Sequence, residues 1–121
     1  MAKSILIADD IPFVRKTLSK IFTDAHYNVV GQAKDGQEAI DLFAQLQPDL
    51  VTMDLVMPNV SGIDATKKIL TMKTDARVVI ISAMTQESLM IDAINAGAKD
   101  YIIKPFAPKD VLATTERVLS F

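Results

Sequence analysis

The sequence predicts an α/β domain: a doubly wound, five-stranded parallel sheet with helices on both faces, forming three layers. The main observation is an alternation along the chain between short runs rich in β-branched residues and stretches whose apolar residues recur at helical spacing. No internal repeat, low-complexity segment or linker interrupts this alternation. Because 121 residues suffice to bury one core and not two, we expect a single domain over residues 1–121.

Five short apolar runs are predicted to be strands that are buried on both faces, as is usual in a parallel sheet. They lie at residues 4–8, 28–33, 50–53, 77–82 and 101–103. A helix is predicted after each of them, because each is followed by one apolar stripe. The stripes comprise Phe13, Val14, Thr17, Leu18, Ile21 and Phe22; Ala39, Ile40 and Phe43; Ala65, Thr66, Ile69 and Leu70; Leu89, Met90, Ala93 and Ile94; and Val111, Leu112, Thr115, Val118 and Leu119.

Local signals support these helices. Asp35 and Ser61 are each followed three residues later by an acidic residue, which is typical of an N-terminal cap, and Gly97 suits a helix end. Pro12 and Pro108 suit the first turn of a helix. Strands that alternate with helices are joined by right-handed crossovers, so the helices must cover both faces of the sheet.

The composition excludes several classes of protein. Half of the residues are apolar and 23% are charged, as in a globular domain, and the net charge of −2 argues against direct nucleic-acid binding. The chain has no cysteine, so it forms no disulfide and has no thiol chemistry. The first apolar run is far shorter than a signal-peptide core or a membrane span. We therefore expect a soluble, cytoplasmic protein that does not bind membranes.

Polar residues follow the predicted strands at their carboxyl ends. Asp9 and Asp10 follow the first strand and Asp54 the third, while Ser82 and Lys104 end the fourth and fifth. Taken singly, the acid pair also fits a solvated turn, Lys104 an exposed lysine and Ser82 the end of a strand. Parallel strands align these ends, however, and ligands of such sheets bind there. We therefore expect the residues to converge, with Asp54 partly buried.

The chemistry of this set favours phosphoryl transfer. Three neighbouring carboxylates repel one another, and Mg²⁺ is the hard cation that such oxygen ligands suit. Asp54 can then attack phosphorus as a nucleophile, while Lys104 neutralises the phosphoryl oxygens and the Ser82 hydroxyl donates a hydrogen bond to one of them. The sequence has no glycine-rich phosphate loop, so nucleotide binding is not supported.

With these residues placed, the sequence resembles the receiver domain of two-component response regulators over nearly its whole length. The resemblance rests on Asp9-Asp10, MDLVMP at 53–58, Ser82-Ala83, AGAKDY at 96–101 and KPF at 104–106, in that order and spacing. It implies a flavodoxin-like sheet with strand order 2-1-3-4-5. The segments GIDA, SAM and KPFAP are similar to those of single-domain chemotaxis regulators of the non-enteric branch.

The resemblance implies a role for each matched residue. Asp54 would be the phosphoacceptor, with Ser82 and Lys104 sensing the phosphoryl group. The implied Mg²⁺ ligands are Asp9, Asp10, Asp54 and the backbone carbonyl of Val56. Tyr101 would be the aromatic switch that acts with Ser82. Positions 56 and 84 tune dephosphorylation in the family, and Val56 and Met84 are both apolar here, which predicts slow self-dephosphorylation.

The resemblance also implies partners. They are a histidine kinase, a phosphatase and a target, which for a chemotaxis regulator is the flagellar motor switch. The target would bind the face formed by the fourth helix, the fifth strand and the fifth helix, where we expect Ile91 to be exposed. We expect a monomer that catalyses only its own phosphorylation and dephosphorylation. Three alternatives stay open: a receiver of a larger or non-chemotaxis regulator, a phosphohydrolase with an aspartyl nucleophile, and a pseudo-receiver that is never phosphorylated.

Overall fold

Strands and helices alternate along the whole chain in the computed structural model, which describes residues 2–121. The strands are β1 (Ser4–Ala8), β2 (Asn28–Ala33), β3 (Leu50–Met53), β4 (Val78–Ser82) and β5 (Asp100–Ile103). The helices are α1 (Pro12–Asp24), α2 (Gly36–Leu46), α3 (Gly62–Met72), α4 (Glu87–Asn95) and α5 (Pro108–Leu119). All ten predicted elements are present, and the strand bounds differ from the predicted ones by at most one residue. No helix within residues 2–121 is long and apolar enough to cross a membrane.

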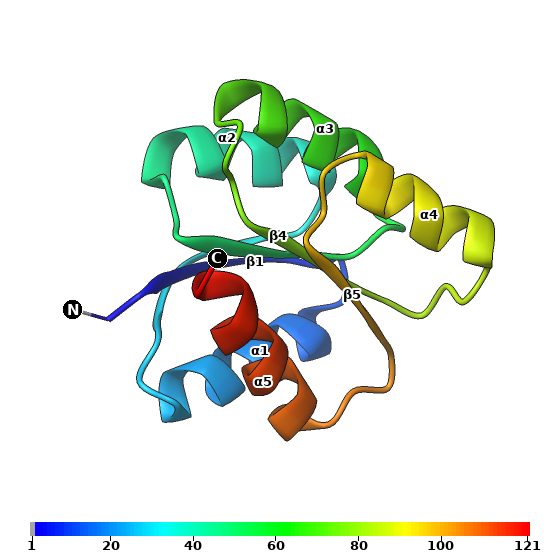
Figure 1. The fold of residues 1–121 in the computed structure, drawn as a ribbon. Coiled ribbons are helices and arrows are strands. Elements are labelled where there is room, and N and C mark those ends of the chain that lie inside the picture. Colours follow the sequence, from blue (N-terminus) through cyan, green and yellow to red (C-terminus); the bar gives the residue numbers. More distant parts are fainter. Residues whose placement is uncertain (1) are drawn as a thin grey trace.

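The five strands form one parallel sheet in the order β2-β1-β3-β4-β5. Figure 1 shows α2, α3 and α4 covering one face of this sheet, with α1 and α5 on the other. The three-layer, doubly wound fold predicted from the sequence is thereby confirmed. The strand order reverses between β1 and β3, which places the expected ligand site at the carboxyl ends of these two strands.

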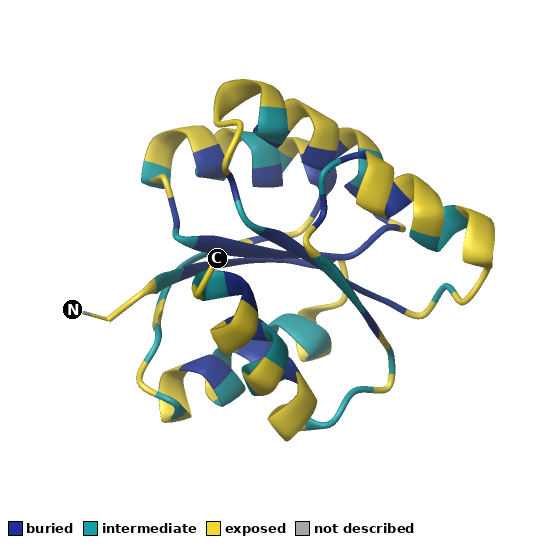
Figure 2. Cartoon of the chain, in the orientation of Figure 1, coloured by how far each residue is buried: buried dark blue, intermediate teal, exposed yellow. Residues whose placement is uncertain are grey.

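The sheet separates two hydrophobic clusters. Successive residues of β1 point to opposite faces, so Leu6 packs with Phe43 of α2 on one side, while Ile5 packs with Phe22 of α1 on the other. The central strands β1, β3 and β4 are almost completely buried, as Figure 2 shows. The edge strands β2 and β5 are only partly covered, so the prediction that all five strands are buried on both faces is wrong for these two.

The predicted helix signals agree with the structure. An Asp35 Oδ1 atom accepts a hydrogen bond from the Glu38 amide at 2.8 Å, and Ser61 Oγ accepts one from the Asp64 amide at 3.2 Å. Both side chains thus satisfy an amide that the helix itself leaves unpaired. Gly97 follows α4 with φ +113°, a conformation that favours glycine.

Two residues of the predicted apolar stripes are exposed instead. Phe13 is 76% exposed and Ile94 is 47% exposed. Phe13 lies in the first turn of α1 and faces a surface groove, while α4 buries only Ala93 completely. Helical spacing therefore identified the right face of each helix but not how far the sheet covers it. The expected exposure of Ile91, at 51%, is confirmed.

Replacing Thr52 with valine is expected to stabilise the domain. The Thr52 side chain is buried in β3, and its hydroxyl has no hydrogen-bond partner within residues 2–121. Valine has the same shape without the unpaired polar atom, so the free energy of unfolding should rise by about 1 kcal/mol. Urea titration measures this change. Thr66→Val is the control, because the equally buried Thr66 hydroxyl donates to the Gly62 carbonyl and its loss should bring no gain. Equal effects of the two substitutions would contradict the explanation.

Candidate functional site

Three carboxylates meet at the carboxyl ends of β1 and β3. Asp9 and Asp10 follow β1 directly, Asp54 follows β3, and each contributes an oxygen that lies within 4.8 Å of the other two. Asp10 is exposed, while Asp9 and Asp54 are buried at 1% and 6% exposure. The expectation that Asp54 is only partly buried is therefore wrong. The Asp54 carboxylate lies against the largely buried Lys104 side chain, whose Nζ atom is 3.1 Å from Asp54 Oδ2.

Lys104 reaches back from the end of β5 and bridges two of these acids. Its Nζ atom lies 2.7 Å from Asp9 Oδ2 and 3.1 Å from Asp54 Oδ2. Its amide donates to the Ser82 carbonyl at 2.9 Å, which holds it against the end of β4, and the peptide bond to Pro105 is cis. The lysine side chain is only 14% exposed, so its charge is largely shielded from solvent. The predicted convergence of Asp9, Asp10, Asp54 and Lys104 is confirmed as geometry.

Burial and charge act in opposite directions on the ionisation of this site. Burial raises the pKa of Asp9 above its ordinary value, although the hydrogen bond from Lys104 opposes the rise. Burial would lower the pKa of Lys104, but its hydrogen bond to Asp9 and the charges of Asp54 and Asp9 outweigh that effect and raise the pKa. Lys104 is therefore a permanent cation at neutral pH. One lysine does not balance three carboxylates.

The donor set suits a small, hard divalent cation. Three carboxylates offer only oxygen ligands, and the Asp10 carboxylate has no hydrogen-bond partner within residues 2–121. Mg²⁺ characteristically binds through one or two carboxylates while it keeps several waters, which an open-sided cluster of this kind permits. The residues present therefore fit a metal site.

Ser82 and Tyr101 both contact Met84, in the loop that follows β4. Ser82 is buried, and its Oγ accepts a hydrogen bond from the Met84 amide at 3.3 Å. The Tyr101 hydroxyl donates to the Met84 carbonyl at 2.6 Å, and burial raises the pKa of this phenol. Neither side chain hydrogen-bonds to the acid cluster in the described part of the chain. The structure thus joins these two residues to each other through Met84.

The two apolar positions predicted to tune dephosphorylation differ in burial. Val56 is 59% exposed and lies two residues after Asp54 in the loop that leads to α3. Met84 is half-buried and contributes its backbone to the contacts of Ser82 and Tyr101. The Val56 side chain has no hydrogen-bonding group, and the Met84 thioether is only a weak acceptor.

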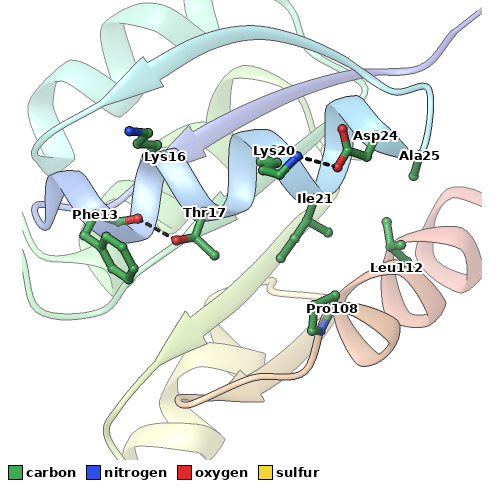
Figure 3. A pocket seen from close by; sticks show the side chains of 9 residues that line it. All are labelled: Phe13, Lys16, Thr17, Lys20, Ile21, Asp24, Ala25, Pro108 and Leu112. Carbon is green, nitrogen blue, oxygen red and sulfur yellow. Dashed lines mark hydrogen bonds and ion pairs between the residues drawn. The ribbon is translucent and has the colours of Figure 1, made fainter.

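A large hollow between α1 and α5 lies away from the acids. Its lining includes Phe13, Ile21 and Leu112, as Figure 3 shows. The volume of this groove is about 770 Å³. A smaller hollow of about 440 Å³ shares Phe13 and extends to Lys104. The large groove is lined mainly by apolar side chains and contains none of the three clustered carboxylates. The volume of a hollow is therefore no guide to the predicted site, which comprises the acids and Lys104.

Sequence reasoning missed two contacts near the acids. Arg15 of α1 donates from Nη1 to the Asp9 backbone carbonyl at 2.7 Å. Asn59, in the loop after Asp54, donates from its side chain to Asp35 at 2.9 Å. Asn59 has a φ of 67°, a conformation that asparagine adopts more readily than most residues, so an asparagine in this loop could have indicated a turn. The sequence could not indicate its partner, Asp35, which is 24 residues away.

The carboxyl edge of this parallel α/β sheet thus carries three acids and one lysine, a set of groups consistent with binding of a divalent cation. The sequence profile of the response regulator receiver domain matches residues 5–116. The chain belongs to this family.

Its relatives include chemotaxis proteins of similar length. The chain is 46% identical over 118 residues to the chemotaxis protein CheY of Thermotoga maritima, with 98% of each chain covered. It is 43% identical over 120 residues to CheY of Bacillus subtilis, covering 99% of this chain and all of the relative. Among solved structures, it is similar to the CheX-CheY-BeF₃-Mg²⁺ complex from Borrelia burgdorferi, with a TM-score of 0.93, 36% identity, and coverage of 96% of this chain and 88% of the other.

Proposed function

We propose that this chain is the phosphorylation-activated signalling protein of a two-component system and acts in chemotaxis. The single observation that carries the proposal is the bridge from Lys104 to both Asp9 and Asp54, which places a shielded cation beside a buried candidate nucleophile. The similarity to CheY over nearly the full length of two relatives supports the chemotaxis pathway. In such a protein the chemistry serves the signal, and it is confined to the chain's own phosphorylation and dephosphorylation.

The transfer step makes Asp54 the nucleophile. One Asp54 carboxylate oxygen attacks the phosphorus of a phosphohistidine on a histidine kinase, so a P–O bond forms while the P–N bond breaks. The released imidazole nitrogen takes up a proton, and the product is an aspartyl phosphate. Lys104, already 3.1 Å from Asp54, neutralises charge on the phosphoryl oxygens as they arrive.

Asp9, Asp10, Asp54 and the backbone carbonyl of Val56 are the residues that would hold Mg²⁺. The bound ion would supply positive charge to the phosphoryl oxygens. The donor set supports this assignment, and so does the presence of Mg²⁺ in the related Borrelia complex. Without it, the burial of Asp9 and Asp54 leaves their mutual repulsion only partly offset by Lys104.

The output follows from the contacts of Ser82 and Tyr101. We infer that the Ser82 hydroxyl turns from the Met84 amide to a phosphoryl oxygen on Asp54. This movement would change the conformation of the loop to which the Tyr101 hydroxyl is hydrogen-bonded. The face of α4, β5 and α5, with the exposed Ile91, would then bind the target, for which the flagellar motor switch is our proposal. Moving such an equilibrium from 1:99 to 99:1 requires about 5.5 kcal/mol of differential interaction. A phosphatase would end the signal, and the related CheY in the Borrelia complex is bound to CheX.

Intact mass spectrometry after incubation with acetyl phosphate and Mg²⁺ tests the proposal. The wild-type protein should gain one phosphoryl group, and the Asp54→Ala variant should gain none. Catalytic turnover of phosphoesters would instead support a phosphohydrolase. An unmodified wild-type protein would support a pseudo-receiver and overturn the proposal.

Replacing Val56 with asparagine is expected to shorten the lifetime of the aspartyl phosphate. Val56 is exposed two residues after the phosphoacceptor, and its apolar side chain cannot orient an attacking water. An amide there can, so decay should become about tenfold faster. Loss of the phosphorylated mass with time after removal of acetyl phosphate measures the rate. Met72→Asn, another exposed apolar position, is the control. An unchanged decay rate in Val56→Asn would refute this role.

Replacing Ser82 with alanine is expected to separate phosphorylation from output. Asp54 and Lys104 are untouched, so the variant should still gain the phosphoryl mass, while the hydroxyl that reports it is absent. Phosphorylation should therefore increase affinity for the target much less than in the wild type. Calorimetric titration with a target peptide, before and after phosphorylation, measures the difference. Thr85→Ala, an exposed hydroxyl in the same loop, is the control. A full increase of affinity in Ser82→Ala would contradict the coupling.

A further inference from the structure

The loop between β3 and α3, residues 54–61, carries the proposed phosphoacceptor and the proposed metal-binding carbonyl of Val56. It contains no regular structure, so its shape depends on individual contacts. One end is held to α3 by the hydrogen bond from the Gly62 amide to the Leu55 carbonyl. In the middle, the Val60 amide donates to the Pro58 carbonyl at 2.8 Å. Neither contact ties the loop to the side of the domain on which α2 begins.

Asn59 makes that connection. Its Nδ2 atom donates to Asp35 Oδ2 at 2.9 Å, across 24 residues of sequence. The other Asp35 oxygen caps α2 by accepting a hydrogen bond from the Glu38 amide, so each oxygen of the carboxylate has a hydrogen-bond partner. Asp35 is only 9% exposed, and a buried carboxylate of this kind is costly to leave without partners. The Asp35–Asn59 pair therefore fixes the middle of the loop to the start of α2.

A close backbone contact lies beside the pair. A Cβ atom added to Gly36, the first residue of α2, would overlap the carbonyl oxygen of Val60. The loop therefore packs directly on the backbone of α2, without room for a side chain between them. The β2 strand that precedes this helix also touches the acid cluster, because the Asp9 amide donates to the Ala33 carbonyl at 3.0 Å. Asp9, Asp35 and the loop after Asp54 thus share one connected framework.

The backbone conformation at Asn59 allows the effect of its side chain to be tested separately from the effect of the backbone. Its φ of 67° lies in the left-handed region, where asparagine and glycine are tolerated far better than other residues. Glycine at this position would keep the backbone path and remove the side chain that makes the hydrogen bond, and a glycine control at another residue of positive φ accounts for the added backbone freedom. The contribution of the amide group can therefore be measured without imposing strain.

We propose that Asn59 is a positioning residue for phosphoryl transfer, acting through Asp35 to hold the loop that presents Asp54 and the Val56 carbonyl. This inference rests on the proposed function. Groups that orient metal ligands from outside typically change metal affinity or activity by 10- to 100-fold when removed. Asn59→Gly should therefore bind Mg²⁺ about tenfold more weakly and be phosphorylated by acetyl phosphate correspondingly more slowly at limiting Mg²⁺. Saturating Mg²⁺ should recover most of the rate.

The experiment compares Mg²⁺ titration calorimetry, phosphorylation rates and urea unfolding in the full chain. Gln47→Gly is the matched control, since Gln47 also has a positive φ, of 48°, and lies at the far end of α2. The double variant Asp35→Asn/Asn59→Asp exchanges donor and acceptor across the same contact, so it should restore Mg²⁺ affinity lost in Asn59→Asp alone. A purely structural role predicts altered unfolding without this rescue.

Different outcomes test the positioning role of Asn59 and the proposed function. Wild-type Mg²⁺ affinity and rate in Asn59→Gly, or no rescue in the exchanged double variant, would overturn the positioning role while leaving the proposed function intact. A wild-type chain that neither binds Mg²⁺ nor gains a phosphoryl group would instead overturn the proposed function. Weakened binding in Asn59→Gly, no change in Gln47→Gly and rescue by exchange together support the inference.

Discussion

Gly62→Ala is expected to lower the free energy of unfolding by about 3 kcal/mol and to slow phosphorylation. A Cβ atom at this position would overlap the Asp54 carbonyl oxygen and lie 2.8 Å from the Leu55 Cα atom. Both obstacles are backbone, so the clash can be relieved only if the start of α3 and the peptide after Asp54 move apart. The proposed nucleophile would then shift relative to Lys104.

Urea unfolding and the rate of mass gain with acetyl phosphate measure the two effects of Gly62→Ala. Gly31→Ala is the matched control in the edge strand β2, where the new Cβ would meet only the ends of side chains, those of Leu46, Leu6 and Leu42, at 2.9, 3.3 and 3.8 Å. Flexible side chains can yield, so this control should lose much less stability and keep the phosphorylation rate. Equal losses in the two variants would show that backbone contact with Asp54 is not the cause.

Lys104→Met is expected to destabilise the metal-free protein by about 3 kcal/mol at neutral pH, because it leaves Asp9 and Asp54 buried without their cation. Adding Mg²⁺ should recover much of this loss, since the ion would supply positive charge to the same carboxylates. The variant should thus depend on Mg²⁺ for stability more strongly than the wild type does. Urea unfolding with Mg²⁺ and with a chelator measures the difference.

The effect of pH on Lys104→Met has a defined sign. The pKa of Asp9 in the folded protein is already raised by burial, so its ionised form costs stability above its ordinary pKa. This cost disappears as the pH falls through the folded pKa, and loss of the lysine should raise that pKa further. The deficit of the variant should therefore shrink on acidification. Lys109→Met, at an exposed lysine without an ion pair in the described chain, should show neither the deficit nor its response to pH and Mg²⁺.

The sequence predicted the fold well because its signals are local and mutually consistent. Runs such as residues 4–8 and 50–53 are too short and too β-branched for helices, and the stripes between them have one period. Convergence of Asp9, Asp54 and Lys104 also followed from the sequence, since parallel strands align their ends. The partial exposure of the edge strands could not be predicted in this way, because the residues of a strand do not indicate whether it has one neighbouring strand or two. The exposure of Phe13 and Ile94 has the same origin.

The geometry of the site itself was harder to predict. The close approach of Gly62 to the Asp54 backbone could not be predicted, because a glycine in a sequence does not reveal what it contacts. The contact between Asn59 and Asp35 joins two loops that are distant along the chain, and neither residue is unusual for a loop or a helix cap. Contacts of this kind depend on tertiary packing, and the periodicity of apolar residues in helices and strands does not predict them.

The division of the interior into two clusters by the sheet has a consequence for how the protein tolerates change. Phe43 belongs to one cluster and Phe22 to the other, so substitutions at these two positions should be additive in their effect on stability, while substitutions within one cluster should be coupled. The α2-α3-α4 layer can therefore accumulate substitutions independently of the α1-α5 layer. The sequences of the two helical layers can in this way change independently, while both layers share the carboxyl edge of the sheet.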